Sequence, residues 1–229
     1  MKLNKKVIIS GLLLVVLFSG FVMYGTEKRN NEVTEKVISQ HDNCGEKNIV
    51  LTVSAHPDFS VQADTLKELT DLAEGGIVYG KVEDISVSCD DTGTVYSTYL
   101  IKVVETVEGN ICIGDLIKVT DFGGIISADE YFEKQTDPKA LELAQQCRGE
   151  NNFVQYLFGG SELPQIGQEY IWYLEKGKND NGIMHYSPVC SYEGVFDIDR
   201  TSNTAERYME DAKEQTVELD ERERMAQEN

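Results

Sequence analysis

Two apolar runs joined by a glycine-marked turn, YLIKVVETVEGNICIGDLIKVTDFGG (99–124), constrain the fold of this chain more than any other feature. In the first run Tyr99, Ile101 and Val103 alternate with polar or outward residues such as Lys102, which is typical of a half-buried strand. The second run, residues 116–120, is expected to return beside it, because glycines mark the connection and the end. The stretch therefore predicts two neighbouring strands of an antiparallel meander.

A third strand is predicted immediately before them in GIVYGKVEDISVS (76–88). Val78, Gly80 and Val82 share one face, and Glu83-Asp84 break the alternation as a β-bulge would. A glycine inside a strand indicates sharp coiling or a close backbone approach, which is how a strand bends around a small barrel. The three strands together favour a small β-barrel.

The later part of the chain supplies more strands. IGQEYIWYLEK (166–176) is apolar on both faces, which predicts a well-buried strand, and residues 178–182 form a hairpin turn around Asn-Gly. Residues 183–187 and 194–198 are expected to complete the sheet, and a short strand is expected at 49–53.

Helices are predicted at three places. Leu66, Leu69 and Leu72 have helical spacing after Asp64, a suitable N-cap. Asp137-Pro138 begins a helix within an insertion at about 127–161. The residues from 201 to 229 read as an acidic C-terminal helix with a thin apolar stripe.

These elements give a mainly β chain with flanking helices (α+β) and a definite domain order. We expect a membrane anchor at 1–25, a stalk at 26–48, an OB-like β-barrel domain at 49–200 with its insertion, and the C-terminal helix at 201–229.

The N-terminal run VIISGLLLVVLFSGFVMY (7–24) holds 18 residues without a charge. At about 1.5 Å per residue it reaches roughly 27 Å, enough for a short transmembrane helix, and it also suits the core of a signal peptide. The exit VMYGTEK is a poor cleavage site, and Phe21 stands where a bacterial lipoprotein would have its cysteine. We therefore expect an uncleaved single-pass anchor with an extracytoplasmic body; secretion after cleavage is the alternative.

The net charge of −19 limits the partners of the body. Such a surface repels phosphate backbones, so a nucleic-acid partner is not expected, whereas water, cations or a basic partner would suit it.

The order of the strands resembles a group of uncharacterised exported proteins of Gram-positive bacteria. The matching stretches are LKELTDLAEGGIVYGKV (66–82), the opening stretch (99–124), PQIGQEYIWYL (164–174) and EGVFDI (193–198). The resemblance implies an OB-type barrel similar to netrin modules and tissue inhibitors of metalloproteinases. Those inhibitors chelate zinc through an N-terminal cysteine, whereas the first cysteine here, Cys44, lies inside the chain, so protease inhibition is not implied.

The cysteines have no C-x-x-C spacing, so no zinc knuckle or thioredoxin-type site is expected. In an oxidising exterior, Cys147 and Cys190 could form a disulfide that closes a loop of 43 residues and holds the insertion. Cys89 could replace either partner.

Sequence motifs give no catalytic, cofactor-binding or metal-binding residues: the three histidines share no ligand spacing, and no nucleophile elbow or phosphate loop is present. Five aromatic residues lie on strands that would face one another in such a barrel. They either form a platform for a ligand or fill the core; they are Tyr96, Tyr99, Tyr170, Trp172 and Tyr173.

The function expected from the sequence is therefore non-catalytic binding: an extracytoplasmic module, tethered to the membrane by its N-terminal helix, for an unknown protein or cell-envelope ligand. The alternative is a cell-envelope hydrolase or accessory enzyme that uses carboxylates far apart in the sequence. A cleft with two carboxylates about 5–9 Å apart and a raised pKa would favour the enzyme. A flat aromatic or apolar patch would favour the binding module.

Overall fold

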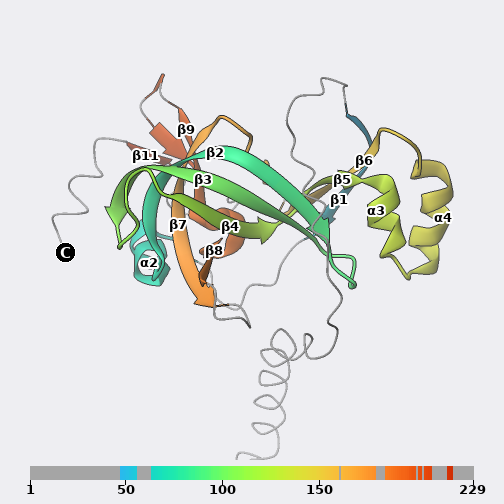
Figure 1. The fold of residues 1–229 in the computed structure, drawn as a ribbon, viewed down its shortest axis with the longest axis horizontal. Helices are drawn as coiled ribbons and strands as arrows, with labels where there is room; N and C mark the ends of the chain where they lie inside the picture. The colour runs from blue at the N-terminus through green and yellow to red at the C-terminus, as the bar shows by residue number, and fades with distance from the viewer. Residues whose placement is uncertain are drawn as a thin grey trace, which may run out of the picture. The chain divides into compact units, whose positions relative to one another are not determined.

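The computed structural model describes residues 47–55, 63–159, 161–178, 184–199, 201–202, 204–207 and 216–218. The predicted anchor and residues 26–46 of the predicted stalk lie outside these. None of the helices in the described ranges is long and apolar enough to cross a membrane. In chain order (Figure 1) the elements are β1 (Asn48–Ala55), α2 (Leu66–Leu72), β2 (Gly76–Cys89), β3 (Val95–Glu108), β4 (Leu116–Phe122), β5 (Gly124–Ser127), α3 (Ala128–Glu133), α4 (Pro138–Cys147), β6 (Asn152–Phe158), β7 (Glu169–Lys178), β8 (Met184–Pro188), a 3-10 helix (Ser191–Gly194), β9 (Val195–Asp199), β10 (Thr204–Glu206) and β11 (Thr216–Glu218).

The chain is mainly β with flanking helices, as predicted, and most of its strands belong to one large sheet of order β11-β10-β9-β7-β2-β3-β4-β8. β7 pairs with β8 as well, so the pairings of β7, β2, β3, β4 and β8 form a closed circuit. The link between β4 and β8 is a single parallel pair, Val119 and Tyr186. Because this closure is so short and β9–β11 extend the sheet beyond it, the sheet is not a simple closed barrel.

The long hairpin of β2 and β3 curves as the sequence predicts (Figure 1). Its register shifts between Val82 and Asp84, which confirms the predicted bulge. It also shifts at Gly80, where a Cβ atom would collide with Cγ2 of Ile101 and lie 3.3 Å from Cδ1 of Trp172. The glycine is therefore needed for close packing, because β3 and β7 side chains occupy the space that a Cβ would take.

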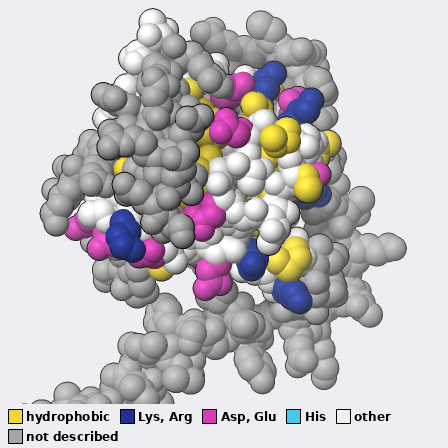
Figure 2. Space-filling model, turned by 90° about the vertical axis from the view of Figure 1, so that its left-hand side faces the viewer, with side chains coloured by type: hydrophobic (Ala, Val, Ile, Leu, Met, Phe, Trp, Pro, Cys, Tyr) yellow, Lys and Arg dark blue, Asp and Glu magenta, His cyan; other side chains and the backbone are white. Residues whose placement is uncertain are grey.

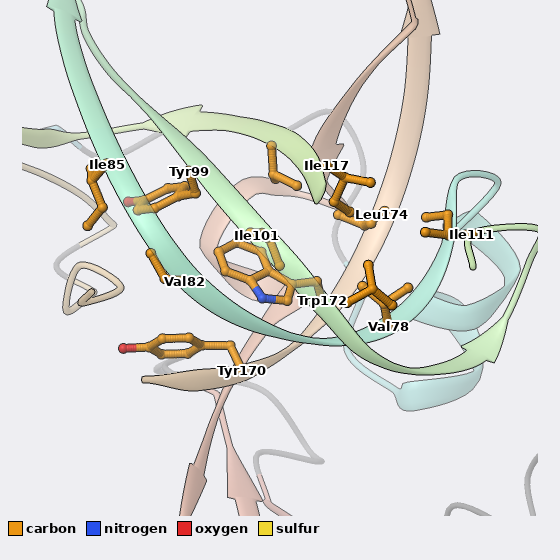
Figure 3. Packing of buried hydrophobic residues seen from close by; sticks show 12 residues of the cluster. Val78, Val82, Ile85, Tyr99, Ile101, Ile111, Ile117, Tyr170, Trp172 and Leu174 are labelled. Atoms are coloured by element: carbon orange, nitrogen blue, oxygen red, sulfur yellow. The ribbon is translucent and has the colours of Figure 1, made fainter. Parts of the chain in front are cut away.

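The curved face of the sheet encloses the core cluster of Figure 3. Tyr99, Ile101 and Val103 are at most 1% exposed while Lys102 is exposed, so the predicted alternation of β3 is confirmed. Trp172 is fully buried at the centre of this cluster. Burial of each such side chain stabilises the fold by roughly 1.5–3 kcal/mol.

The opposite face of β7 supports α2. Tyr173 and Phe196 pack with Leu66 and Leu69 in a second cluster, so β7 is buried on both faces, as predicted. The N-cap prediction is corrected by one residue: Thr65, not Asp64, accepts a hydrogen bond from the Glu68 amide and completes a capping box. Asp64 contributes its backbone carbonyl elsewhere, to a buried arginine described below.

The insertion is a small α/β unit rather than a single helix. α4 begins as predicted, with Asp137 accepting from the amides of Lys139 and Ala140. Unexpectedly, β5 and β6 form a three-stranded sheet with β1 in the order β1-β6-β5, and β1 runs parallel to β6. The short strand predicted near residue 50 therefore exists but belongs to this second sheet. A third core cluster, which includes Phe132 and Val154, joins the insertion to Val95 of β3.

The predicted C-terminal helix is wrong for the residues that the structure describes. β10 pairs with β9 and β11 pairs with β10, so the sheet continues where the helix was expected. The reason is tertiary: Ala205 is fully buried against the α2 cluster, and pairing with the edge of β9 outweighs a thin apolar stripe. Residues 203, 208–215 and 219–229 of the predicted helix lie outside the described ranges.

The predicted Cys147–Cys190 disulfide is absent, and both residues are thiols. Cys147 belongs to the cluster of the insertion, whereas Cys190 packs against the α2 cluster, so the two side chains belong to different cores. The hairpin of β7 and β8 is confirmed by their antiparallel pairing up to Lys178 and Met184. Residues 179–182 of its predicted turn, 178–182, lie outside the described ranges.

Candidate functional site

A cavity of about 740 Å³ lies against the end of β4, the start of β7, β9, β10 and the connection 161–168. Its size is within the range of about 300–1,000 Å³ that is usual for small-molecule sites. Two kinds of side chain dominate its wall. The carboxylates are Asp121, Glu162, Asp197, Asp199 and Glu206, and the aromatic rings are Tyr99, Phe122, Tyr170 and Tyr192.

Asp121 is the buried carboxylate of this cavity, with 8% of its surface exposed. Its Oδ1 accepts hydrogen bonds from the Ser191 hydroxyl and from the Phe122 amide at 2.8 Å. Burial raises the pKa of Asp121 from 3.8 to about 6, and these two hydrogen bonds oppose the rise. Burial therefore destabilises the charged form of this carboxyl group.

The backbone of the segment that supplies Ser191 to Asp121 has a conformation that is uncommon for non-glycine residues. Cys190 and Ser191 both have positive φ angles, of 51° and 58°. Two successive non-glycine residues in this region cost roughly 1–3 kcal/mol each, and here they bring the Ser191 hydroxyl to Asp121. Ser191 holds the carboxylate in position without itself lining the cavity.

Two tyrosines form the wall nearest the core. Tyr99 and Tyr170 flank Trp172, with ring centroids 5.5 and 5.8 Å from that of the tryptophan. Figure 3 shows that both hydroxyl oxygens point to the same side, away from Leu174 and Ile111. The Tyr170 hydroxyl accepts a hydrogen bond from the Gln165 amide at 3.0 Å, which ties the connection 161–168 to β7. Burial raises the pKa of both phenols, and the charge of Asp121 raises that of Tyr99 further.

The basic residue in the wall, Arg207, is 3% exposed and engaged with backbone. Its Nη1 donates to the carbonyls of Ala63 at 2.9 Å and Glu193 at 3.4 Å, and its Nη2 donates to that of Asp64 at 3.1 Å. The guanidinium also lies over the Phe196 ring, 5.6 Å from its centroid. Arg207 thereby ties the end of β10 to the residues that precede α2.

A second carboxylate of the cavity differs from Asp121 in its environment. Asp199 is exposed, and hydrogen bonds from Ser202 and from the Thr201 amide lower its pKa. The cavity therefore contains one carboxyl group with a raised pKa and one with a lowered pKa.

The structure divides the five aromatic residues proposed from the sequence. Tyr99 and Tyr170 line the cavity and Trp172 supports them from behind. Tyr173 faces the α2 cluster instead, because neighbouring residues of a strand point to opposite faces. Tyr96 does not itself line the cavity; it packs on Phe122 of the wall, 5.1 Å between centroids, and Phe122 stacks in turn on Phe158 at 4.5 Å.

Other surfaces of the described residues provide weaker evidence for a binding site. On the face in Figure 2, hydrophobic side chains are small patches separated by acidic and basic ones. Among the described residues no three His, Cys, Asp or Glu side chains are grouped so that they could hold a metal ion. The cavity around Asp121 is therefore taken as the candidate site in the described part of the chain.

Comparisons with known proteins assign no family. No protein-family model, curated protein or solved structure matches the chain.

Sequence reasoning missed Asp121, Ser191 and Arg207. A signal for Asp121 was present, because Ile117, Val119 and Asp121 share the inward face of β4. An acidic residue in an apolar inward series is typical of a functional position. It was overlooked because the strand was expected to end at residue 120. Ser191 and Arg207 carry no such signal, since each reaches the site through long-range packing.

Proposed function

We propose that this protein is a non-catalytic, extracytoplasmic binding module, with an OB-like barrel that holds a small ligand in the cavity around Asp121. The cavity carries the proposal: it combines a buried carboxylate with the rings of Tyr99 and Tyr170 at a size suited to a small molecule. The OB-like reading is supported by the circuit of five strands, in which β4 and β8 are parallel. The apolar N-terminal run supports a membrane tether with the body outside.

The wall of the cavity suits retention of a ligand. Aromatic rings supply apolar contact area, while carboxylate and hydroxyl groups orient polar parts of the ligand. Asp121 is fixed by two hydrogen bonds and Tyr170 by one, so these side chains are already in position before a ligand arrives. Such preorganisation reduces the entropic cost of binding.

A second function, hydrolysis in the cell envelope, is favoured by one observation. The raised pKa of Asp121 and the lowered pKa of Asp199 in one cavity match the assignment of a general acid and an ionised partner. This alternative predicts turnover that falls as pH rises above about 6, an alkaline limb that Asp121→Asn abolishes.

Thermal unfolding of the full chain tests the binding proposal with three small probes: N-acetylglucosamine, glycerol 3-phosphate and choline. We expect at least one to raise the melting temperature and to be recovered chemically unchanged. Gln168→Trp, which enlarges an exposed side chain of the cavity wall, should abolish that shift. No shift with any probe, or an equal shift in the variant, would contradict binding in the cavity; consumption of a probe would favour the hydrolase.

A further inference from the structure

We infer that the cavity around Asp121 binds the positively charged group of a small organic ammonium compound. This inference rests on the proposed function and specifies its ligand class. It depends on three observations: the charge of the wall, the second oxygen of Asp121 and the aromatic rings beside it.

The wall of the cavity is strongly acidic. Among the described residues it contains five carboxylates and one cationic side chain, Arg207, whose guanidinium donates to the carbonyls of Ala63, Glu193 and Asp64. The resulting negative potential, concentrated in a concave site, attracts cations and repels anions. A phosphate or carboxylate ligand is therefore disfavoured.

Asp121 itself has no cationic partner in the part of the chain that the structure describes. It is more than nine-tenths buried, and both of its hydrogen bonds reach Oδ1. Within the described residues Oδ2 accepts no hydrogen bond, although Asp121 lines the cavity. A carboxylate taken out of water is unfavourable unless it is paired, so a cation in the cavity would supply the missing interaction.

The aromatic rings indicate an organic cation rather than a metal ion. Phe122 and Tyr192 contribute half-buried rings to the same wall, whereas Tyr99 and Tyr170 are only 1% and 7% exposed. Ring faces attract ammonium groups, and aromatic walls with a carboxylate are a known chemical solution for quaternary ammonium. Metal ions need several oxygen or nitrogen ligands together, and no such group of side chains exists among the described residues.

Protonation of Asp121 should oppose binding. With a pKa of about 6, its anionic fraction falls to roughly a tenth at about pH 5, so affinity should fall roughly tenfold from about pH 7.5. Other ionisable groups also face the cavity, so only the difference from Asp121→Asn isolates the effect of this residue. They are Glu162, Asp197, Asp199, Glu206, Arg207, Tyr99, Tyr170 and Tyr192.

Isothermal titration calorimetry of the full chain tests the inference with choline and with its uncharged isostere 3,3-dimethylbutan-1-ol. At about pH 7.5 and physiological ionic strength, we expect choline to bind at least tenfold more tightly than the isostere. Asp121→Asn should weaken choline at least tenfold and leave the isostere unchanged within about twofold. Glu150→Gln, an exposed change outside the cavity wall, removes the same net charge and should leave both affinities unchanged.

Several results would overturn the inference. They are absence of choline binding up to about 50 mM, equal affinity for the isostere, or retention of choline by Asp121→Asn. Circular dichroism establishes that this variant is folded, and binding of the isostere to it provides a second check on the cavity. Binding of N-acetylglucosamine without choline would refute this inference while leaving the binding module intact.

Discussion

Replacement of Asp121 by asparagine should stabilise the protein at neutral pH. Asparagine has the same shape, and its carbonyl oxygen can still accept hydrogen bonds from Ser191 and the Phe122 amide. It carries no charge, so it removes the cost of an ionised carboxylate that is 8% exposed.

The size of the effect follows from the pKa of Asp121. The folded-state pKa, about 6, lies above the ordinary value of 3.8. The folded protein therefore binds this proton more tightly than the unfolded chain does. The contribution of Asp121 to stability is most favourable below about pH 4, falls as pH rises to about 6, and stays low above that. A shift of about two units corresponds to roughly 3 kcal/mol, of which about 2 kcal/mol accrue between about pH 4.5 and 7.5.

Urea denaturation of wild type and Asp121→Asn at these two pH values measures the effect. We expect the stability of the variant relative to wild type to increase by about 2 kcal/mol from the lower to the higher pH. Asp197→Asn, an exposed carboxylate of the same cavity, should change stability by less than about 0.5 kcal/mol at either pH. A relative stability that is independent of pH, or that decreases as pH rises, would refute the reasoning. It would mean that interactions within the folded protein already offset the free-energy cost of the buried Asp121 charge.

Three further predictions concern the scaffold. Ser191→Ala should destabilise the protein by about 1.5–3 kcal/mol at neutral pH in urea denaturation, because it removes a hydrogen bond to a buried carboxylate; unchanged stability would contradict that role. Gly80→Ala should cost about 1–3 kcal/mol by colliding with Ile101, and less in an Ile101→Ala background; equal costs would argue against the collision. Thr65→Ala should cost about 1 kcal/mol and Asp64→Ala less than about 0.5, since Thr65 closes the capping box; the reverse order would restore Asp64 as the N-cap.

The strands of the large sheet could be predicted because their signals are local. The alternation of Tyr99, Ile101 and Val103, the bulge at Asp84 and the two-sided apolar pattern of β7 each follow from neighbouring residues. Short-range rules determine such features, and tertiary structure reinforced them here.

The insertion and the C-terminus depend on distant partners. β1 and β6 pair in parallel although residues 48 and 152 are far apart in the chain. Parallel strands are not joined by a short turn, so the sequence contains no turn motif from which this pairing could be predicted. Likewise β10 follows the free edge of β9 rather than the helical preference of its own residues. Local propensity is a weak predictor where an unpaired strand edge is available.

Only part of the candidate site could be predicted from the sequence, because some of its residues are brought together by contacts between distant segments. Tyr99 and Tyr170 could be proposed because aromatic residues on facing strands stand out in the sequence. Asp121, Ser191 and Arg207 come from a strand end, a 3-10 helix and the C-terminal strands, which only the folded chain brings together.

Carbon-13 NMR of the Asp121 carboxyl group tests the central claim most directly, with its resonance assigned by loss in Asp121→Asn. Without ligand, we predict a titration midpoint near pH 6, the value that burial produces. With saturating choline, the midpoint should fall, because a cation beside the carboxylate favours its charged form. A midpoint that choline leaves unchanged would contradict the claim that this cavity receives a cation.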